Sequence, residues 1–204
     1  MSVEVLSEDP LADGRGARVV AVTTPLTADD ARALRAGDRV RITGELYTAR
    51  DAAHRRLAEL DAAGEPWPFP AEGSILYYVG PTPERPGHVI GSAGPTTASR
   101  MDPHLRMTLE HGVRAAVGKG GRGPEAKAAI AEFGAAYMAA VGGLGAVLAR
   151  SIKGAEIVAF DDLGTEAIRR LEVEAFPAVV VYDAEGGDLY TAAKEEWRGQ
   201  AASS

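Results

Sequence analysis

The fold class is decided by residues 38–79, DRVRITGELYTARDAAHRRLAELDAAGEPWPFPAEGSILYYV, in which three patterns follow one another. Residues 38–43 alternate polar and apolar side chains, which predicts a half-buried strand. Residues 50–63 place apolar side chains on one face and end before Gly64, which predicts an amphipathic helix. Residues 74–79 are a short apolar run, which predicts a buried strand.

The same alternation extends to both sides of this stretch. Further strands are expected at residues 18–23, 88–91, 113–117, 137–141, 156–160 and 178–182. Further helices are expected from the capping-box pattern at 27–30 to Gly37, from Asp102 to Gly112, and from 124 to 133. Alternating strands and helices predict an α/β or mixed class, folded as one compact domain.

The two ends of the chain differ from its centre. Residues 1–17 are polar, and residues 1–23 are interpreted as an N-terminal lead-in that is partly disordered. The folded domain is expected over residues 24–191. Residues 192–204 are polar and are expected to form a flexible tail.

The composition excludes several classes of function. The 204 residues carry 22 Lys and Arg against 29 Asp and Glu, and the net charge of −7 argues against a nucleic-acid binder. No apolar run approaches the ~20 residues of a membrane helix, and residues 1–18 do not resemble a signal peptide, so a cytoplasmic location is expected. The absence of cysteine excludes disulfides, a catalytic thiol, a cysteine zinc site and an iron–sulfur cluster held by this chain alone.

Three segments place charged or hydroxyl side chains among glycines or at element ends. The first is TARDAAH, residues 48–54, at the start of the expected helix. Its Arg50 could hold a carboxylate with two parallel hydrogen bonds, and Asp51 and His54 are neighbours on one helix face. The alternative is a solvated first turn in which Asp51 interacts with the helix dipole.

The second segment is GPTTASRM, residues 94–101. Its backbone N–H groups could cradle an anion, Arg100 adds positive charge, and Thr96 and Thr97 supply hydroxyls. A hydroxyl becomes a base only where nearby cations stabilise its alkoxide. The alternative is a turn and helix cap formed by the hydroxyls.

The third segment is GKGGRG, residues 118–123, which contains Lys119 but lacks the order of a Walker loop, so a surface loop is its alternative. The histidines at 88, 104 and 111 show no metal-ligand spacing and are read as structural or surface residues. If the fold brings Arg50, Arg100 and Lys119 together, the pocket suits a small dicarboxylate and leaves a hydroxyl for proton transfer.

Six motifs resemble the β subunit of class I fumarate hydratase and L(+)-tartrate dehydratase, over residues 24–190. They are GDRVRITG (37–44), TARDAAH (48–54), YVGP (78–81), GSAGPTTASRMD (91–102), GKGG (118–121) and DLGTEAI (162–168). The resemblance implies a swivelling β/β/α domain and an iron–sulfur hydro-lyase that hydrates fumarate reversibly to (S)-malate. L(+)-tartrate dehydratase and mesaconate hydratase β subunits are alternatives within this class, and a non-catalytic anion-binding or regulatory module is the alternative outside it.

The resemblance also assigns roles to residues. Three cations would bind substrate carboxylates: Arg50, Arg100 and Lys119. Two hydroxyls, Thr96 and Thr97, would lie at the reacting carbon, with Thr96 as the proposed base. Asp51 and His54 would orient Arg50 or relay a proton.

The resemblance further implies a partner. The [4Fe–4S] cluster would be held by cysteines of a separate α subunit, and this chain would be active only with that subunit. We expect a hetero-oligomer in which the αβ pair dimerises, a small dicarboxylate substrate, and a possible homodimer when the chain is isolated.

Overall fold

The computed structural model describes residues 2–10 and 16–202, which form eight strands, six α-helices and two 3₁₀ turns. The strands are β1 (Val3–Pro10), β2 (Gly16–Thr23), β3 (Arg39–Thr48), β4 (Ile75–Tyr77), β5 (Ala115–Gly118), β6 (Ala136–Ala139), β7 (Ile152–Ala159) and β8 (Ile168–Tyr182). The helices are α1 (Ala28–Ala33), α2 (Asp51–Ala63), α3 (Asp102–Glu110), α4 (Pro124–Phe133), α5 (Gly145–Ala149) and α6 (Leu189–Ala202). The 3₁₀ turns are η1 (Ala98–Met101) and η2 (Asp161–Glu166).

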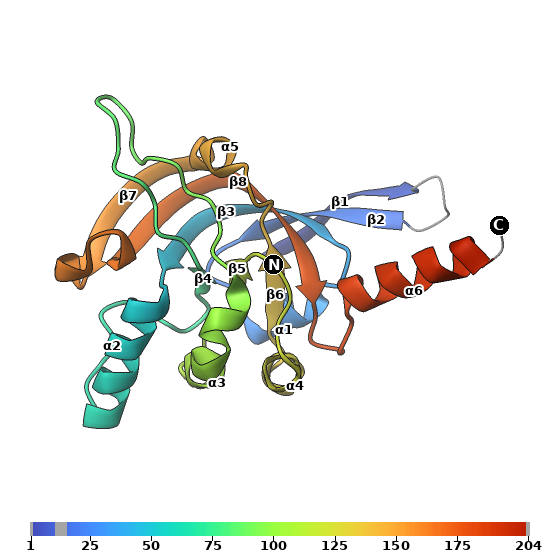
Figure 1. Ribbon diagram of the computed structural model, residues 1–204, viewed down its shortest axis with the longest axis horizontal. Helices are drawn as coiled ribbons and strands as arrows, with labels where there is room; N and C mark the ends of the chain where they lie inside the picture. The colour runs from blue at the N-terminus through green and yellow to red at the C-terminus, as the bar shows by residue number, and fades with distance from the viewer. Residues whose placement is uncertain (1, 11–15, 203–204) are drawn as a thin grey trace.

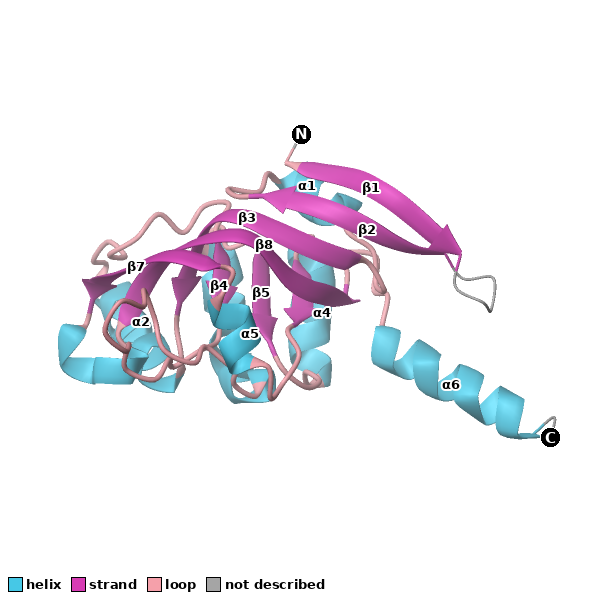
Figure 2. Cartoon of the chain, turned by 90° about the horizontal axis from the view of Figure 1, so that it is seen from above, coloured by secondary structure: helices cyan, strands magenta, loops and turns pink. Residues whose placement is uncertain are grey.

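The strands form one sheet in the order β1-β2-β3-β4-β5-β6-β8-β7. Strands β2 to β6 run parallel to one another, whereas β1 is antiparallel to β2, and β8 is antiparallel to β3 and to β6. Because β8 pairs with both of them, β3, β4, β5, β6 and β8 close into a small barrel-like sheet. Helices α2, α3 and α4 lie together on one side of these strands (Figure 1), and Figure 2 shows the curved sheet from above.

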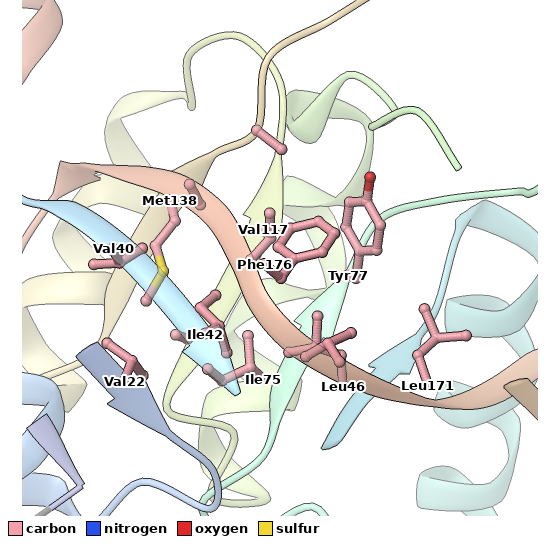
Figure 3. Packing of buried hydrophobic residues seen from close by; sticks show 14 of the residues in the cluster. Val22, Val40, Ile42, Leu46, Ile75, Tyr77, Val117, Met138, Leu171 and Phe176 are labelled. Atoms are coloured by element: carbon pink, nitrogen blue, oxygen red, sulfur yellow. The ribbon is translucent and has the colours of Figure 1, made fainter. Parts of the chain in front are cut away.

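Strand β4 separates two hydrophobic clusters. Ile75 and Tyr77 belong to the cluster enclosed by the barrel, which Figure 3 shows from close by, together with Ile42 from β3 and Phe176 from β8. The alternate residue Leu76 faces the second cluster, between the sheet and the helices. Burial of each such side chain contributes about 1.5–3 kcal/mol. The α/β class and the single compact domain are therefore confirmed.

Several local predictions are confirmed. Helix α2 ends at Gly64, whose φ of 69° lies in the left-handed region that glycine favours. The capping box at the start of α1 is present, since Thr27 and Asp30 bond reciprocally. Helix α1 ends at Ala33, however, and not at Gly37.

The expectation of a polar lead-in is wrong for the described residues. Residues 3–10 form β1, which pairs antiparallel with β2 and so joins the sheet. Because β1 is an edge strand, its residues 4–7 are exposed whether they are polar or apolar, and the sequence shows no alternation that would indicate a strand. Residues 1 and 11–15, also part of the expected lead-in, lie outside the described residues.

Two other expectations need correction. Residues 88–91 lie in a loop and not in a strand, and Val89 is 48% exposed, so its apolar character does not reflect burial. The polar stretch from 192 continues helix α6 to Ala202. This helix projects away from the sheet (Figure 1), and residues 203–204 lie outside the described part.

Among the described helices, none is long and apolar enough to cross a membrane.

Candidate active site

The expected site segments meet at one edge of the sheet, where parallel strands end. Arg50 follows β3, Tyr78 follows β4 and Lys119 follows β5. The segment that carries Thr96 lies between Tyr78 and Lys119. The Thr96 N–H donates to the Tyr78 carbonyl (2.7 Å), and the Thr96 carbonyl accepts from the Lys119 N–H (3.0 Å). The carboxyl ends of parallel strands are the usual position of ligand sites in open α/β sheets.

The hydroxyl residues and Lys119 are neighbours through their backbones. Thr97 and Lys119 occupy bridged positions, and the Ala98 N–H donates to the Lys119 carbonyl (2.9 Å). Thr97 and Lys119 are exposed, whereas Thr96 is half-buried. Two hydroxyls and an ammonium group therefore arise from adjacent backbone positions.

Arg50 is the N-cap residue of α2 and packs against a glycine. A Cβ at Gly80 would overlap the Arg50 guanidinium, so only glycine leaves room for this side chain. Glu166 from η2 contacts Arg50, with its Oε1 3.4 Å from Nη2, and accepts the Ala52 N–H with Oε2 at 2.8 Å. Sequence reasoning assigned Glu166 no role, although the residue lies in the DLGTEAI motif.

Asp51 lies between two guanidinium groups. Arg100 donates from Nε to Oδ1 at 3.0 Å, and its Nη2 lies 2.7 Å from Oδ2. The Arg50 Nη2 lies 3.9 Å from the same Oδ2. The structure therefore brings Arg50, Asp51 and Arg100 together, and half of the Arg100 side chain is exposed.

His54 lies behind Arg50 and does not reach solvent. Its Nδ1 is 2.9 Å from the Arg50 carbonyl, which can only accept, so Nδ1 carries a proton. Its ring lies 5.6 Å from the rings of Tyr78 and His104. Burial lowers the pKa of His54 to about 4, so the imidazole is neutral at pH 7. This geometry suits the orientation of Arg50 better than a proton relay.

The Gly-rich loop over residues 118–123 contains a buried arginine that sequence reasoning did not select. Arg122 is paired with Asp102 and lies against the rings of Tyr78 and Tyr137. The pattern GKGGRG is typical of a surface loop, and nothing in it indicates that its second cation, Arg122, is buried. Asp102 belongs to the motif GPTTASRMD, but nothing in the sequence indicates that Arg122 is its partner.

A pocket of about 380 Å³ adjoins the site. Its lining includes Thr165, whose carbonyl lies beside Gly80 and therefore close to Arg50. The rest of the lining comes from the loop over residues 81–90, from β7, from Gly164 and from Arg169. Neither Arg100 nor Lys119 lines this pocket, and both are exposed, so their side of the site is an open face.

The site consists of charged and hydroxyl side chains. The chain has no cysteine, and no group of three or more His, Asp or Glu that could hold a metal is present in the described part. The residues of this chain therefore do not fit an iron–sulfur cluster as ligands. Three cations, two carboxylates and two hydroxyls lie at one sheet edge of this α/β domain, with Arg100 and Lys119 on its exposed side.

The family is shown by comparison with known proteins. Residues 3–193 match the family described as Fumarase C-terminus, and the chain belongs to it. It is 41% identical over 157 residues to "Fumarate hydratase 2" of Leishmania major, covering 76% of this chain and 28% of that protein. It is 40% identical over 154 residues to "Fumarate hydratase class I, anaerobic" of Escherichia coli, covering 74% and 28% respectively.

A third relative differs in length. The chain is 38% identical over 174 residues to the "Putative L(+)-tartrate dehydratase subunit beta" of Methanocaldococcus jannaschii. That match covers 81% of this chain and 88% of the relative. The chain thus spans about a quarter of the matched fumarate hydratases but most of the Methanocaldococcus protein.

Proposed function

We propose that this chain is the β subunit of an iron–sulfur-dependent hydro-lyase that reversibly hydrates fumarate to (S)-malate. One observation carries the proposal: motifs far apart in the sequence bring Arg50, Arg100 and Lys119 to a single sheet edge beside two threonine hydroxyls. Membership in the Fumarase C-terminus family supports it.

The three cations would bind the two carboxylates of the substrate. The guanidinium groups of Arg50 and Arg100 present planar forks that match a carboxylate, whereas Lys119 supplies a point charge. The carboxylates of Asp51 and Glu166 restrict the orientations of the two arginines. Because these two negative charges face three positive ones, the group as a whole stays positively charged. A site with this charge balance favours a small dianion over a neutral substrate.

Thr96 would transfer the proton at the reacting carbon, with Thr97 beside it. The Thr96 backbone is held on both sides, by Tyr78 and by Lys119, so its side chain starts from a fixed position. A threonine hydroxyl is a weak base, and neighbouring cations are what would stabilise its alkoxide. Asp51 and His54 would serve the reaction through Arg50 and Arg100.

The cofactor belongs to the partner in this proposal. The [4Fe–4S] cluster would be ligated by the α subunit, because this chain supplies no cysteine. When bound, such a cluster supplies Lewis-acid chemistry. The open face around Arg100 and Lys119 is where the α subunit would close the site, and the resulting αβ pair would dimerise.

L(+)-tartrate is the second candidate substrate. The observation that favours it is the near-complete correspondence in length with the Methanocaldococcus relative. Mesaconate carries the same two carboxylates, so the cation set would serve it as well. Selection among these diacids depends on groups around the second and third carbons.

The decisive experiment is anaerobic co-purification with an α subunit, followed by assays on fumarate, (S)-malate, L(+)-tartrate and mesaconate. We expect fumarate hydration by the complex and none by the lone chain. Arg100→Ala should abolish most of this activity, whereas Arg106→Ala, which removes an exposed pair with Glu132, should not. Activity on tartrate alone would select the second candidate. A loaded complex that binds diacids without turning them over would indicate a non-catalytic anion-binding module.

A further inference from the structure

Arg122 is a buried charge for which the proposed reaction has no use. Its side chain is fully buried and lies 5.4 Å and 5.3 Å from the ring centres of Tyr78 and Tyr137. Its Nη1 donates to the Tyr78 hydroxyl at 3.3 Å, while its Nη2 is buried without a hydrogen-bond partner. A guanidinium in such a place needs a reason, because burial of a charge is costly even when the charge is paired.

The partner of Arg122 is Asp102, at the first turn of α3. Arg122 donates from Nε to Oδ1 of Asp102 at 2.5 Å. The second oxygen, Oδ2, accepts the Gly123 N–H at 2.8 Å, so one carboxylate holds both the side chain and the backbone of the Gly-rich loop. The Tyr137 hydroxyl also holds this loop, because it donates to the Gly120 carbonyl at 2.9 Å.

The two members of this ion pair lie close in sequence to two of the site cations. Asp102 stands two residues after Arg100, and Arg122 stands three residues after Lys119. The pair therefore joins the two segments that carry two of the proposed carboxylate-binding cations. The Lys119–Ala98 backbone bond joins the same segments on the other side, so the two cations are attached to one rigid unit.

We propose that the buried Arg122–Asp102 pair positions Arg100 and Lys119 at the separation that a dicarboxylate requires. This inference rests on the proposed function, since it assigns the two cations to the two ends of one ligand. Arg122 and Asp102 touch no substrate in this account. They are positioning residues. Their loss would weaken the binding of a dianion, which needs both cations at a fixed separation, more than the binding of a single carboxylate by either cation.

The variant Arg122→Lys distinguishes a positioning role of Arg122 from a mere need for a positive charge at this position. An ammonium group keeps the positive charge but cannot reach Asp102 and Tyr78 with the fixed fork of a guanidinium. Asp102→Asn is the complementary variant, because the amide oxygen can still accept the Gly123 N–H while the ion pair is lost. Arg18→Lys is the matched control, since Arg18 on β2 forms a two-point pair with the buried Asp38, and β3 and β4 separate β2 from β5 in the sheet.

The test compares a dicarboxylate with a monocarboxylate of the same length, as inhibitors of the complex with the α subunit. Succinate and butyrate are the two probes, and thermal unfolding of each complex is recorded beside them. In Arg122→Lys and Asp102→Asn we expect the inhibition constant of succinate to rise about tenfold, because small misplacements of binding groups have large effects. The constant of butyrate should stay within about twofold, since one cation suffices to bind it.

Each other outcome has a defined meaning. An unchanged preference for succinate in both variants would overturn the positioning role and leave the proposed function intact. Equal weakening of both probes, or failure of both variants to fold, would show that the pair is only structural. A wild-type complex without any preference for succinate would overturn the proposed function and this inference together. A tenfold change in Arg18→Lys would show that loss of any buried pair has this effect.

Discussion

The carboxylate of Asp51 contacts the guanidinium of Arg100 at two points, with Nε to Oδ1 at 3.0 Å and Nη2 to Oδ2 at 2.7 Å. The two residues are 49 positions apart in the sequence. The same carboxylate lies 3.9 Å from the Arg50 guanidinium, so it separates two cations that would otherwise repel each other. A helix residue thus fixes the orientation of an arginine that sequence patterns had linked only to the threonine segment.

Asp51→Asn should weaken substrate binding more than it weakens the fold. Without the carboxylate, Arg100 loses its two-point partner, and the repulsion between Arg50 and Arg100 rises. We expect KM in the complex with the α subunit to increase about three- to tenfold. The loss of stability should stay within about 1 kcal/mol, because Arg100 is half exposed and such pairs contribute little. Steady-state kinetics and urea unfolding measure the two effects.

Glu132→Gln is the control for that variant. It removes the partner of the exposed Arg106, which also makes two contacts with its carboxylate. KM should not change in this variant. An equal rise in KM in both variants would show that Asp51 has no special relation to the site.

The sequence predicts elements whose signals are local. Helix α2 begins and ends where its amphipathic pattern and Gly64 predict, and the capping box of α1 needs only four residues. Strand β1 could not be predicted, because an edge strand with exposed side chains has the composition of a loop. Strand β8 runs over 168–182 although only 178–182 was expected, since its pairing with β3 brings together segments that are far apart in the sequence.

In the candidate site too, local features could be predicted from the sequence, whereas contacts between distant residues could not. The cations could be selected because each stands beside glycines or at an element end. Their partners could not, since pairing is a property of the folded chain: Glu166 accepts the Ala52 N–H across 114 residues. The burial of Arg122 could not be predicted for a further reason: a Gly-rich sequence indicates a loop and gives no sign that Tyr78, which follows β4, and Tyr137 of β6 pack against its side chain.

Gly80→Ala should displace Arg50 without unfolding the chain. The added methyl group would overlap the end of the Arg50 side chain, which is flexible and can move, although the Thr165 carbonyl at 3.3 Å limits the space. We expect KM to rise about tenfold as Arg50 leaves its position. The unfolding midpoint should fall by only a few degrees, which corresponds to about 1 kcal/mol. Gly199→Ala, whose added methyl group would enter open space, is the control, and equal kinetics in both variants would contradict the role of Gly80.

Glu166 should show separable effects on stability and on binding. In Glu166→Gln the side chain can still accept the Ala52 N–H, whereas Glu166→Ala leaves the first turn of α2 without this acceptor. We expect Glu166→Ala to cost about 1 kcal/mol of unfolding free energy and Glu166→Gln clearly less. Both variants remove the anion beside Arg50, so KM should change similarly in both. A change in KM confined to the alanine variant would mean that Glu166 acts only as a cap.

The stability of the protein should depend on pH through His54. Burial lowers its pKa in the folded chain to about 4 from the ordinary 6.5, so between these values the unfolded chain binds a proton that the folded chain does not. Stability therefore falls as the pH decreases from 6.5 to 4, by about 3 kcal/mol from this group. His54→Gln lacks this dependence, so its deficit relative to wild type should shrink by a similar amount over that interval. Urea unfolding at several pH values measures it, with His88→Gln, at an exposed position, as the control. A deficit that stays constant from pH 7 to pH 4 would show that His54 takes up its proton equally well in the folded and the unfolded chain.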